Sequence, residues 1–268
     1  MRLRKQSLST PAAARRIADA LRINTADVGY AGLKDERSIS EQWFSVPSAA
    51  FSAAAVQAID DVMLLEHTMQ ARKLRRGVHL GNRFEILLRE VEQPHVPPDP
   101  FIFPNYFGQR RFGYDNIEQA SNWLKNRRRR RITPFKRGIY LSVLRSLLFN
   151  ELLGCRVASG NWAELLDGDV ADASGNPTGP LWGRGTSRTL GLARELEDQT
   201  LADYADLKEG LEFAGVDQDR RSLVGTASAV NVVEVAPGQL MISFFLPVGT
   251  YATVALDEYF KLCDYATS

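Results

Sequence analysis

The sequence predicts an α+β fold, in which a sheet formed from both ends of the chain is interrupted by a mainly helical insertion. Apolar runs typical of strands occur before residue 92 and again in 223–247. Helical patterning occupies most of the chain between these two regions. The 268 residues, 44% of them apolar, are enough to bury a sizeable core.

Local signals predict the elements of the first half. Thr10-Pro11 favours the start of a helix. The stretch GYAGLKDERS is typical of a Gly-rich turn, and EQWFSV continues it as a strand with period-two alternation. Prolines keep residues 92–104 extended or looped. The expected elements are a helix at 11–22, a turn at 29–38, a strand at 41–46, a helix at 48–58, and strands at 62–75 and 83–91.

The second half is expected to begin with helices and to end with a pair of strands. Between them lies DGDVADASGNPTGPLWGRG, residues 167–185, and loops this long usually have a function or mark a deletion. A glycine turn and a short helix follow the last strand. The expected elements are helices at 116–126, 139–158 and 161–167, helical patterning at 189–214, and two strands joined at Pro237-Gly238.

The charge of the chain is divided unevenly. Residues 1–156 hold 26 Lys and Arg against 15 Asp and Glu, whereas the remainder holds 7 and 17. Basic residues cluster without any acid in 71–84 and 127–137. A solvated charged surface accounts for either cluster alone. Two clusters in one half, each near aromatic residues, also fit a surface that binds nucleic acid.

Several kinds of site are excluded. No GxxxxGK[ST] loop, GxGxxG turn or GxSxG elbow is present, so we expect no cofactor. The histidines His67, His79 and His95 have no Cys or His partner at metal-ligand spacing, so we expect no metal. No apolar run approaches the ~18 residues of a membrane span. The distant cysteines Cys155 and Cys263 fit buried thiols in a reducing compartment.

The segment FPNYFGQRRFG, residues 103–113, places aromatic residues beside arginines. Aromatic rings stack on an unstacked base while guanidinium groups hold phosphates, which suits single-stranded or flipped nucleotides. A buried aromatic turn with exposed arginines is the alternative on composition alone. An ordinary surface turn is likewise an alternative for the glycine-rich segment 29–38.

Six blocks together resemble the tRNA pseudouridine synthase D family. In chain order they are GYAGLKDERSISEQWFSV, KLRRGVHLGNRFEI, PNYFGQRRFG, YLSVLRSLLFNELL, GPLWGRG and FFLPVGTYATVAL. The resemblance implies a pseudouridine synthase-type mixed, mainly antiparallel sheet flanked by helices. It also implies an isomerase that converts a uridine of tRNA, at position 13, to pseudouridine. The implied domains are a catalytic domain at 1–130 and 226–268 and a helical insertion at 131–225 that contributes to the RNA cleft.

The resemblance also assigns roles to residues of this chain. Asp35 is the implied catalytic residue, acting as nucleophile or base on a flipped nucleotide, with Lys34 beside it. Phe107 is expected to stack on the flipped uracil, and Asn105 to hold the catalytic loop or the base. The residues expected to hold the RNA backbone are Arg75, Arg76 and Arg110. The expected partner is tRNA or another structured RNA, bound by a cytoplasmic monomer.

Two features depart from the family pattern. Family members carry several dozen residues, including an opening strand, before the block that begins MRLRKQ here, so the catalytic sheet is expected to lack an edge strand. They also carry a longer run between LLDGDV and PTGPLWGRG, which ADASGN alone joins here. An RNA-binding or RNA-folding homologue that has lost turnover is therefore an alternative, although such a protein has no need of Asp35.

Overall fold

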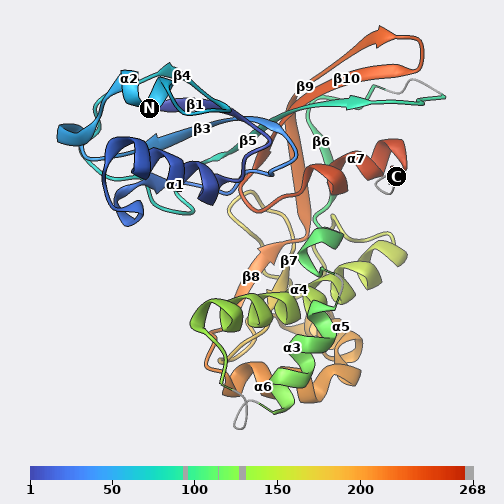
Figure 1. Cartoon of the computed structure of the whole chain (residues 1–268). Coiled ribbons are helices and arrows are strands. Elements are labelled where there is room, and N and C mark those ends of the chain that lie inside the picture. Colours follow the sequence, from blue (N-terminus) through green and yellow to red (C-terminus); the bar gives the residue numbers. More distant parts are fainter. Residues whose placement is uncertain (93–95, 114, 127–130, 263–268) are drawn as a thin grey trace. The chain divides into compact units, whose positions relative to one another are not determined.

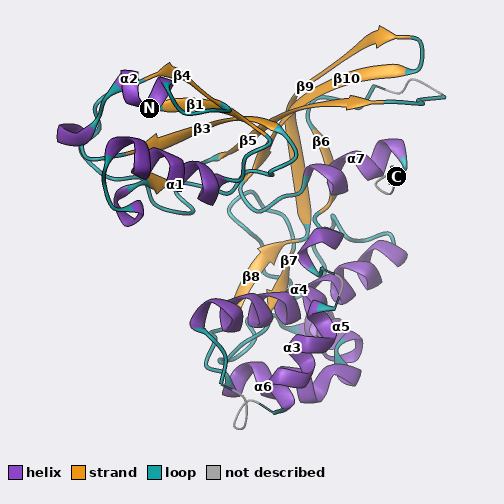
Figure 2. Ribbon diagram, viewed as in Figure 1, coloured by secondary structure: helices purple, strands orange, loops and turns teal. Residues whose placement is uncertain are grey.

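The computed structural model of the chain describes residues 1–92, 96–113, 115–126 and 131–262 (Figure 1). Its contacts form two compact units, Met1–Leu80 and Gly81–Ser268. Both units combine helices with antiparallel sheets (Figure 2), which confirms the α+β class. The boundaries at 130 and 226, between a catalytic domain and an insertion, stay a prediction.

The first unit is a four-stranded antiparallel sheet with helices packed against it. The strand order is β2 (Gly29–Tyr30), β3 (Ile39–Ser45), β1 (Arg2–Gln6) and β4 (Val62–Glu66), and the helices are α1 (Thr10–Leu21) and α2 (Ala53–Gln57). Leu3, Ile17 and Phe44 are almost completely buried in one core cluster. Burial of each such side chain contributes about 1.5–3 kcal/mol, and it fixes α1 over the sheet.

Strand β1 was not expected from the sequence. Its inward-facing residues are Leu3 and Lys5, so it lacks the apolar alternation by which strands are recognised. Lys5 is 1% exposed, and its ammonium group donates a hydrogen bond to the carbonyl of Leu8 at 2.5 Å. On the outer face Arg4 pairs with Glu41 at 2.8 Å. Because β1 lies between β3 and β4, it is an inner strand, and the missing edge strand stays a prediction.

The second unit contains an antiparallel sheet built from segments far apart in the sequence. Its strand order is β5 (Gly81–Leu88), β10 (Gln239–Pro247), β9 (Val224–Ala236) and β6 (Phe101–Pro104), and α7 (Ala252–Phe260) shares its core. The turn at Pro237-Gly238 joins β9 to β10 as predicted, and Gly238 has a φ of 71°, a conformation that favours glycine. The sequence predicted one sheet built from both ends of the chain. Early segments do pair with late ones here, β5 with β10 and β6 with β9, but the early strands β3 and β4 belong to the separate sheet of the first unit.

The rest of the second unit is mainly helical. Its elements are α3 (Asn116–Lys125), α4 (Pro134–Ala158), α5 (Gly191–Thr200), α6 (Ala205–Phe213) and a two-stranded antiparallel ribbon of β7 (Thr178–Leu181) and β8 (Asp219–Ser222). Trp123, Leu144 and Leu211 bring α3, α4 and α6 into one buried cluster. Among the described helices, α4 alone is long and apolar enough to cross a membrane, and half of its apolar window is buried inside the protein, as in the core helix of a globular domain.

Several predicted bounds need correction. Helix α4 begins at Pro134 rather than at 139, because the Thr133 hydroxyl caps it by accepting a hydrogen bond from the backbone amide of Lys136 at 3.2 Å. The strand expected at 62–75 ends at Glu66, and the helix expected at 48–58 is reduced to a 3₁₀ turn followed by α2.

The helix expected at 161–167 is absent, because a buried arginine binds the carbonyl groups that it would need. Arg156 donates hydrogen bonds to the backbone carbonyls of Asn161, at 2.9 Å, and Glu164. Its guanidinium also pairs with Asp169 at 2.9 Å, and both side chains are at most 3% exposed. The segment therefore folds as a series of turns around Arg156.

Candidate active site

The turn that carries Asp35 is fixed by a buried polar network in the first unit. The Thr10 hydroxyl accepts a hydrogen bond from the backbone amide of Lys34 and donates one to Oε1 of Gln42, both at 2.9 Å. The Gln42 amide then donates to the carbonyl of Gly32 at 2.6 Å. Thr10, in the first turn of α1, and Gln42, in the middle of β3, are both buried, so this loop is attached to the core of the unit.

The side chains of the Lys34–Asp35 pair have different environments. Asp35 is exposed, and its backbone carbonyl accepts a hydrogen bond from the Ser38 hydroxyl at 2.8 Å. Lys34 is half-buried, and this burial lowers the pKa of its ammonium group, while the charge of Asp35 acts in the opposite direction. A carboxylate on a fixed and exposed turn is accessible to a large substrate.

Replacing Thr10 with valine is expected to destabilise the first unit by about 1–3 kcal/mol, because Oε1 of Gln42 and the Lys34 amide lose a buried partner. Urea unfolding followed by circular dichroism measures the change. Ser9→Ala is the matched control, since the Ser9 side chain makes no capping hydrogen bond, and it should cost less than about 0.5 kcal/mol. Equal losses in the two variants would contradict the role given to Thr10.

A basic cavity of about 790 Å³ lies beside this turn in the same unit. It is lined by four cationic side chains and by no carboxylate: Arg15, Lys73, Arg75 and Arg76. Arg76 donates a hydrogen bond to the Tyr30 hydroxyl at 2.9 Å, and its guanidinium carbon lies 5.4 Å from the centre of the Tyr30 ring. The cavity thus offers positive charge and an aromatic ring to an anionic ligand.

In the second unit, Asn105 directly follows β6 and is 4% exposed. Its amide nitrogen donates to the carbonyl of Ser222 at 2.9 Å, and its Oδ1 accepts from Arg221 at 2.6 Å. Both ends of the amide are therefore bound to protein. This arrangement suits a residue that holds the loop rather than one that binds the base directly.

Phe107, two residues further, is held through both its backbone and its ring. The Asn150 amide of α4 accepts from the Phe107 backbone N–H at 2.9 Å and donates to its carbonyl at 3.0 Å. Phe149 packs against the ring at 5.4 Å between ring centres, with an interplanar angle of 83°. The guanidinium carbons of Arg221 and Arg111 lie 4.1 and 5.9 Å from the centre of the ring. Phe107 is half-buried, and two cations flank it.

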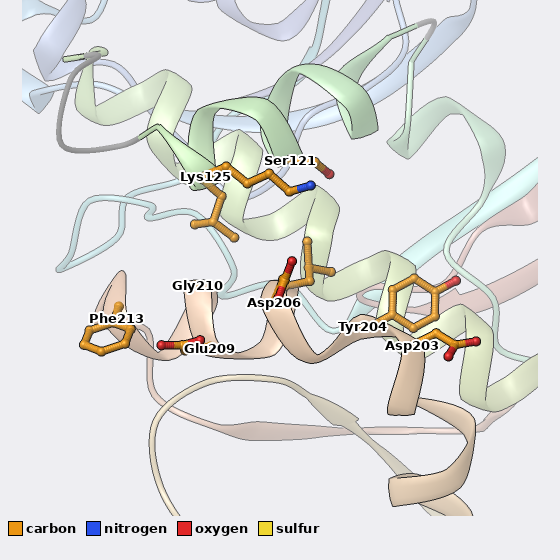
Figure 3. Close-up of a pocket in the computed structure, with 10 residues that line it drawn as sticks. Ser121, Lys125, Asp203, Tyr204, Asp206, Glu209, Gly210 and Phe213 are labelled. Carbon is orange, nitrogen blue, oxygen red and sulfur yellow. The ribbon is translucent and has the colours of Figure 1, made fainter.

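A different cavity of about 550 Å³ lies between α3 and α6 (Figure 3). Three acidic side chains from α6 and the turn before it line this cavity, namely Asp203, Asp206 and Glu209, and Lys125 of α3 lines its other side. Of the three, Asp206 points toward α3 (Figure 3). None of the predicted site residues lines this cavity. Its negative charge makes it a poor site for an RNA phosphate.

Comparison with known proteins identifies the family. A sequence profile described as tRNA pseudouridine synthase D (TruD) matches residues 1–120. The tRNA pseudouridine synthase D of Methylococcus capsulatus is 35% identical, with 96% of this chain and 82% of that protein covered. That of Nitrosococcus oceani is 36% identical, with 95% and 81% covered. The chain belongs to the tRNA pseudouridine synthase D family.

A solved structure assigned to tRNA pseudouridine synthase D of Methanosarcina mazei has the same fold. It superposes with a TM-score of 0.63 over 97% of this chain and 87% of its own, at 18% sequence identity. The predicted resemblance and fold are thus confirmed. So is the enzyme class, since tRNA pseudouridine synthases are isomerases.

The predicted site residues fall into three groups. Lys34 and Asp35 lie on the fixed turn, and Arg75 and Arg76 line the basic cavity of the same unit. Asn105 and Phe107 lie in one loop of the second unit, linked through Arg221. The remaining expectations lie outside the described residues, and they concern the Arg110 side chain, the arginines at 127–130, His95 and Cys263. Cys155 is half-buried rather than buried, with a free thiol.

Two side chains around Phe107, Asn150 and Arg221, were not predicted from the sequence, and Arg111 was noted only as one of the arginines of segment 103–113. Asn150 stands within the block YLSVLRSLLFNELL, so its position in the family pattern was a usable signal. Arg221 lies in none of the six blocks, and it contacts Asn105 across 116 residues of chain. Among the described residues, no group of three or more His, Cys, Asp or Glu side chains is arranged to hold a metal.

Proposed function

We propose that this chain converts the uridine at position 13 of tRNA to pseudouridine without a cofactor. The observation that supports this most is the exposed Asp35, carried on a turn that Thr10 and Gln42 fix from within the core. The bond between ribose C1′ and uracil N1 breaks, the base turns, and a bond forms between C1′ and C5. The C5 proton is released and N1 gains a proton, so that nothing is oxidised. Asp35 acts on the sugar as nucleophile or as base.

The target uridine must leave the stack to reach a carboxylate, which costs a few kcal/mol. In this proposal Phe107 stacks on the flipped uracil and offsets part of that cost, while Asn105 holds the loop. Arg75, Arg76 and Arg110 bind RNA phosphates, and Lys34 supports the charge of Asp35. The enzyme acts as a monomer in the cytoplasm, where tRNA is modified.

A tritium-release assay with tRNA labelled at C5 of uracil tests the proposal, because pseudouridine formation releases that tritium. Release is expected from tRNA with uridine at position 13 and not from the same tRNA with cytidine there. Equal tritium release from the two tRNAs would overturn the assignment of position 13 as the target. Salt-sensitive tRNA binding without any release would overturn the isomerase and favour the binding homologue.

Replacing Arg75 with glutamine is expected to weaken tRNA binding and to flatten its salt dependence. Each phosphate that loses its cationic partner lowers the magnitude of the slope of log K against log salt concentration by about 0.7–0.9. Fluorescence anisotropy at four or more salt concentrations gives the slope. Arg16→Gln is the matched control, because Arg16 neighbours Arg15 but pairs with Asp61 outside the cavity. An unchanged slope for Arg75→Gln would show that Arg75 touches no phosphate.

A further inference from the structure

Arg221 lies where three segments of the second unit meet. Its Nη2 donates hydrogen bonds to the backbone carbonyl of Asn105 at 3.1 Å and to Oδ1 of the same residue at 2.6 Å. Its Nη1 donates to the carbonyl of Gly249 at 2.9 Å. The guanidinium carbon is 4.1 Å from the centre of the Phe107 ring. One side chain thus connects β8, the loop after β6 and the turn before α7.

We infer that Arg221 is a positioning residue for uridine isomerisation, which fixes the Asn105 amide and the face of the Phe107 ring on which the uracil stacks. This inference rests on the proposed function, because it requires Phe107 to be the stacking residue. Arg221 itself need not touch the substrate. It acts through the two residues that it holds.

The chemistry of the site indicates that Arg221 orients Asn105 and Phe107 and does not merely tie the chain segments together. Burial lowers the pKa of Arg221 to about 10, and the positive charge of Arg111 acts in the same direction, although Arg221 remains protonated at neutral pH. Among the described residues, no carboxylate forms an ion pair with either arginine. A neutral amide could bind the same carbonyls at a smaller desolvation cost. A guanidinium adds several donors in one plane and a flat cationic face for an aromatic ring.

The neighbouring Arg220 shows what a purely structural arginine looks like in the same strand. It points to the opposite side of β8 and pairs with Glu197 at 2.7 Å, and both side chains are 3% exposed. It also donates to Oγ1 of Thr178 at 2.7 Å. Arg220 therefore satisfies its charge within the core, whereas Arg221 directs its donors to the loop of Asn105 and Phe107.

The Phe107 backbone does not depend on Arg221, because Asn150 binds both its N–H and its carbonyl. Loss of the Arg221 guanidinium should therefore loosen the ring and free Oδ1 of Asn105, while the Asn105 nitrogen stays bound to Ser222 and the loop stays attached to α4. This separation makes the inference testable without unfolding the site.

The first measurement reports on the ring alone. With 4-fluorophenylalanine at position 107, the ¹⁹F resonance should be single and sharp in the otherwise unchanged protein. Arg221→Gln should shift and broaden it, whereas Arg184→Gln, which removes an exposed arginine paired with Asp217, should leave it unchanged. An unchanged resonance in Arg221→Gln would overturn the inference. If Arg221→Gln does not fold, Arg221→Lys is used in its place, because lysine keeps the positive charge but lacks the planar set of donors of the guanidinium.

The second measurement is tritium release by unlabelled protein. Arg221→Lys is expected to lower kcat about 10–100-fold, the size of effect that a small misplacement of reacting groups produces, with KM within about threefold of the wild type. A wild-type kcat in Arg221→Lys would overturn the inference. If the wild-type protein itself releases no tritium, the proposed function is overturned, and the fluorine measurement still decides whether Arg221 fixes the ring.

Discussion

Replacing Asp35 with asparagine is expected to lower the rate of tritium release by more than about a thousandfold, since loss of a nucleophile or base removes an entire catalytic step. The amide has nearly the same shape as the carboxylate but is neither a competent nucleophile nor a base. Asp35 is exposed, and the network that fixes its turn uses Thr10, Gln42 and backbone groups. The fold and the tRNA affinity should therefore stay unchanged.

The control for this variant is Glu36→Gln, which removes the adjacent exposed carboxylate and should retain the wild-type rate. Affinity for tRNA is measured for both variants at one salt concentration, so that a loss of rate is separated from a loss of binding. Full activity in Asp35→Asn would show that another group performs the reaction. A tenfold loss of affinity in that variant would show that Asp35 contributes to binding.

Replacing Arg156 with methionine is expected to cost about 3–5 kcal/mol of the free energy of unfolding of the second unit. The Asp169 carboxylate, 3% exposed, would remain buried without its cation. The carbonyls of Asn161 and Glu164 would lose their donor as well, so the turns at 161–167 would loosen.

Denaturant unfolding followed by tryptophan fluorescence measures this loss, since Trp162 stands in the affected segment. Arg184→Met is the control. Arg184 pairs with Asp217, but the two side chains are 58% and 83% exposed, and exposed ion pairs contribute only about 0–1 kcal/mol to stability. A double substitution of Arg156 and Asp169 by apolar residues should recover part of the stability. No recovery would place the loss in the hydrogen bonds to the carbonyls.

The sequence predicted those parts of the fold whose signals are local. Helix α1 and the hairpin of β9 and β10 have apolar periodicity and a clear start or turn, and both occur where expected. Strand β1 was missed because Lys5 occupies one of its two inward positions. The false helix at 161–167 arose because its pattern is helical, whereas Arg156, from the preceding helix, binds its carbonyls.

The candidate site divides in the same way. The turn of Asp35 and the loop of Phe107 could be predicted as site segments because each is a contiguous block that resembles the family, and their roles stay predictions. Arg221 was not predicted, because the contacts that suggest a role for it are with residues 28 and 116 positions away. A single arginine in a strand carries no local sign of what it faces.

The ribbon of β7 and β8 bears on how the length of this chain can change over evolution. Along β8, successive residues point to opposite faces, so deleting one residue just before Arg220 would exchange the two guanidiniums between the Glu197 side and the Asn105 side. The ADASGN segment before β7 is different. It forms a turn in which the Asp172 carboxylate accepts hydrogen bonds from the backbone amides of Ser174 and Asn176, and a side chain added at Gly175 would meet only open space. A change of length in this segment would leave the alternation of β8 unchanged, so Arg220 and Arg221 would keep their faces.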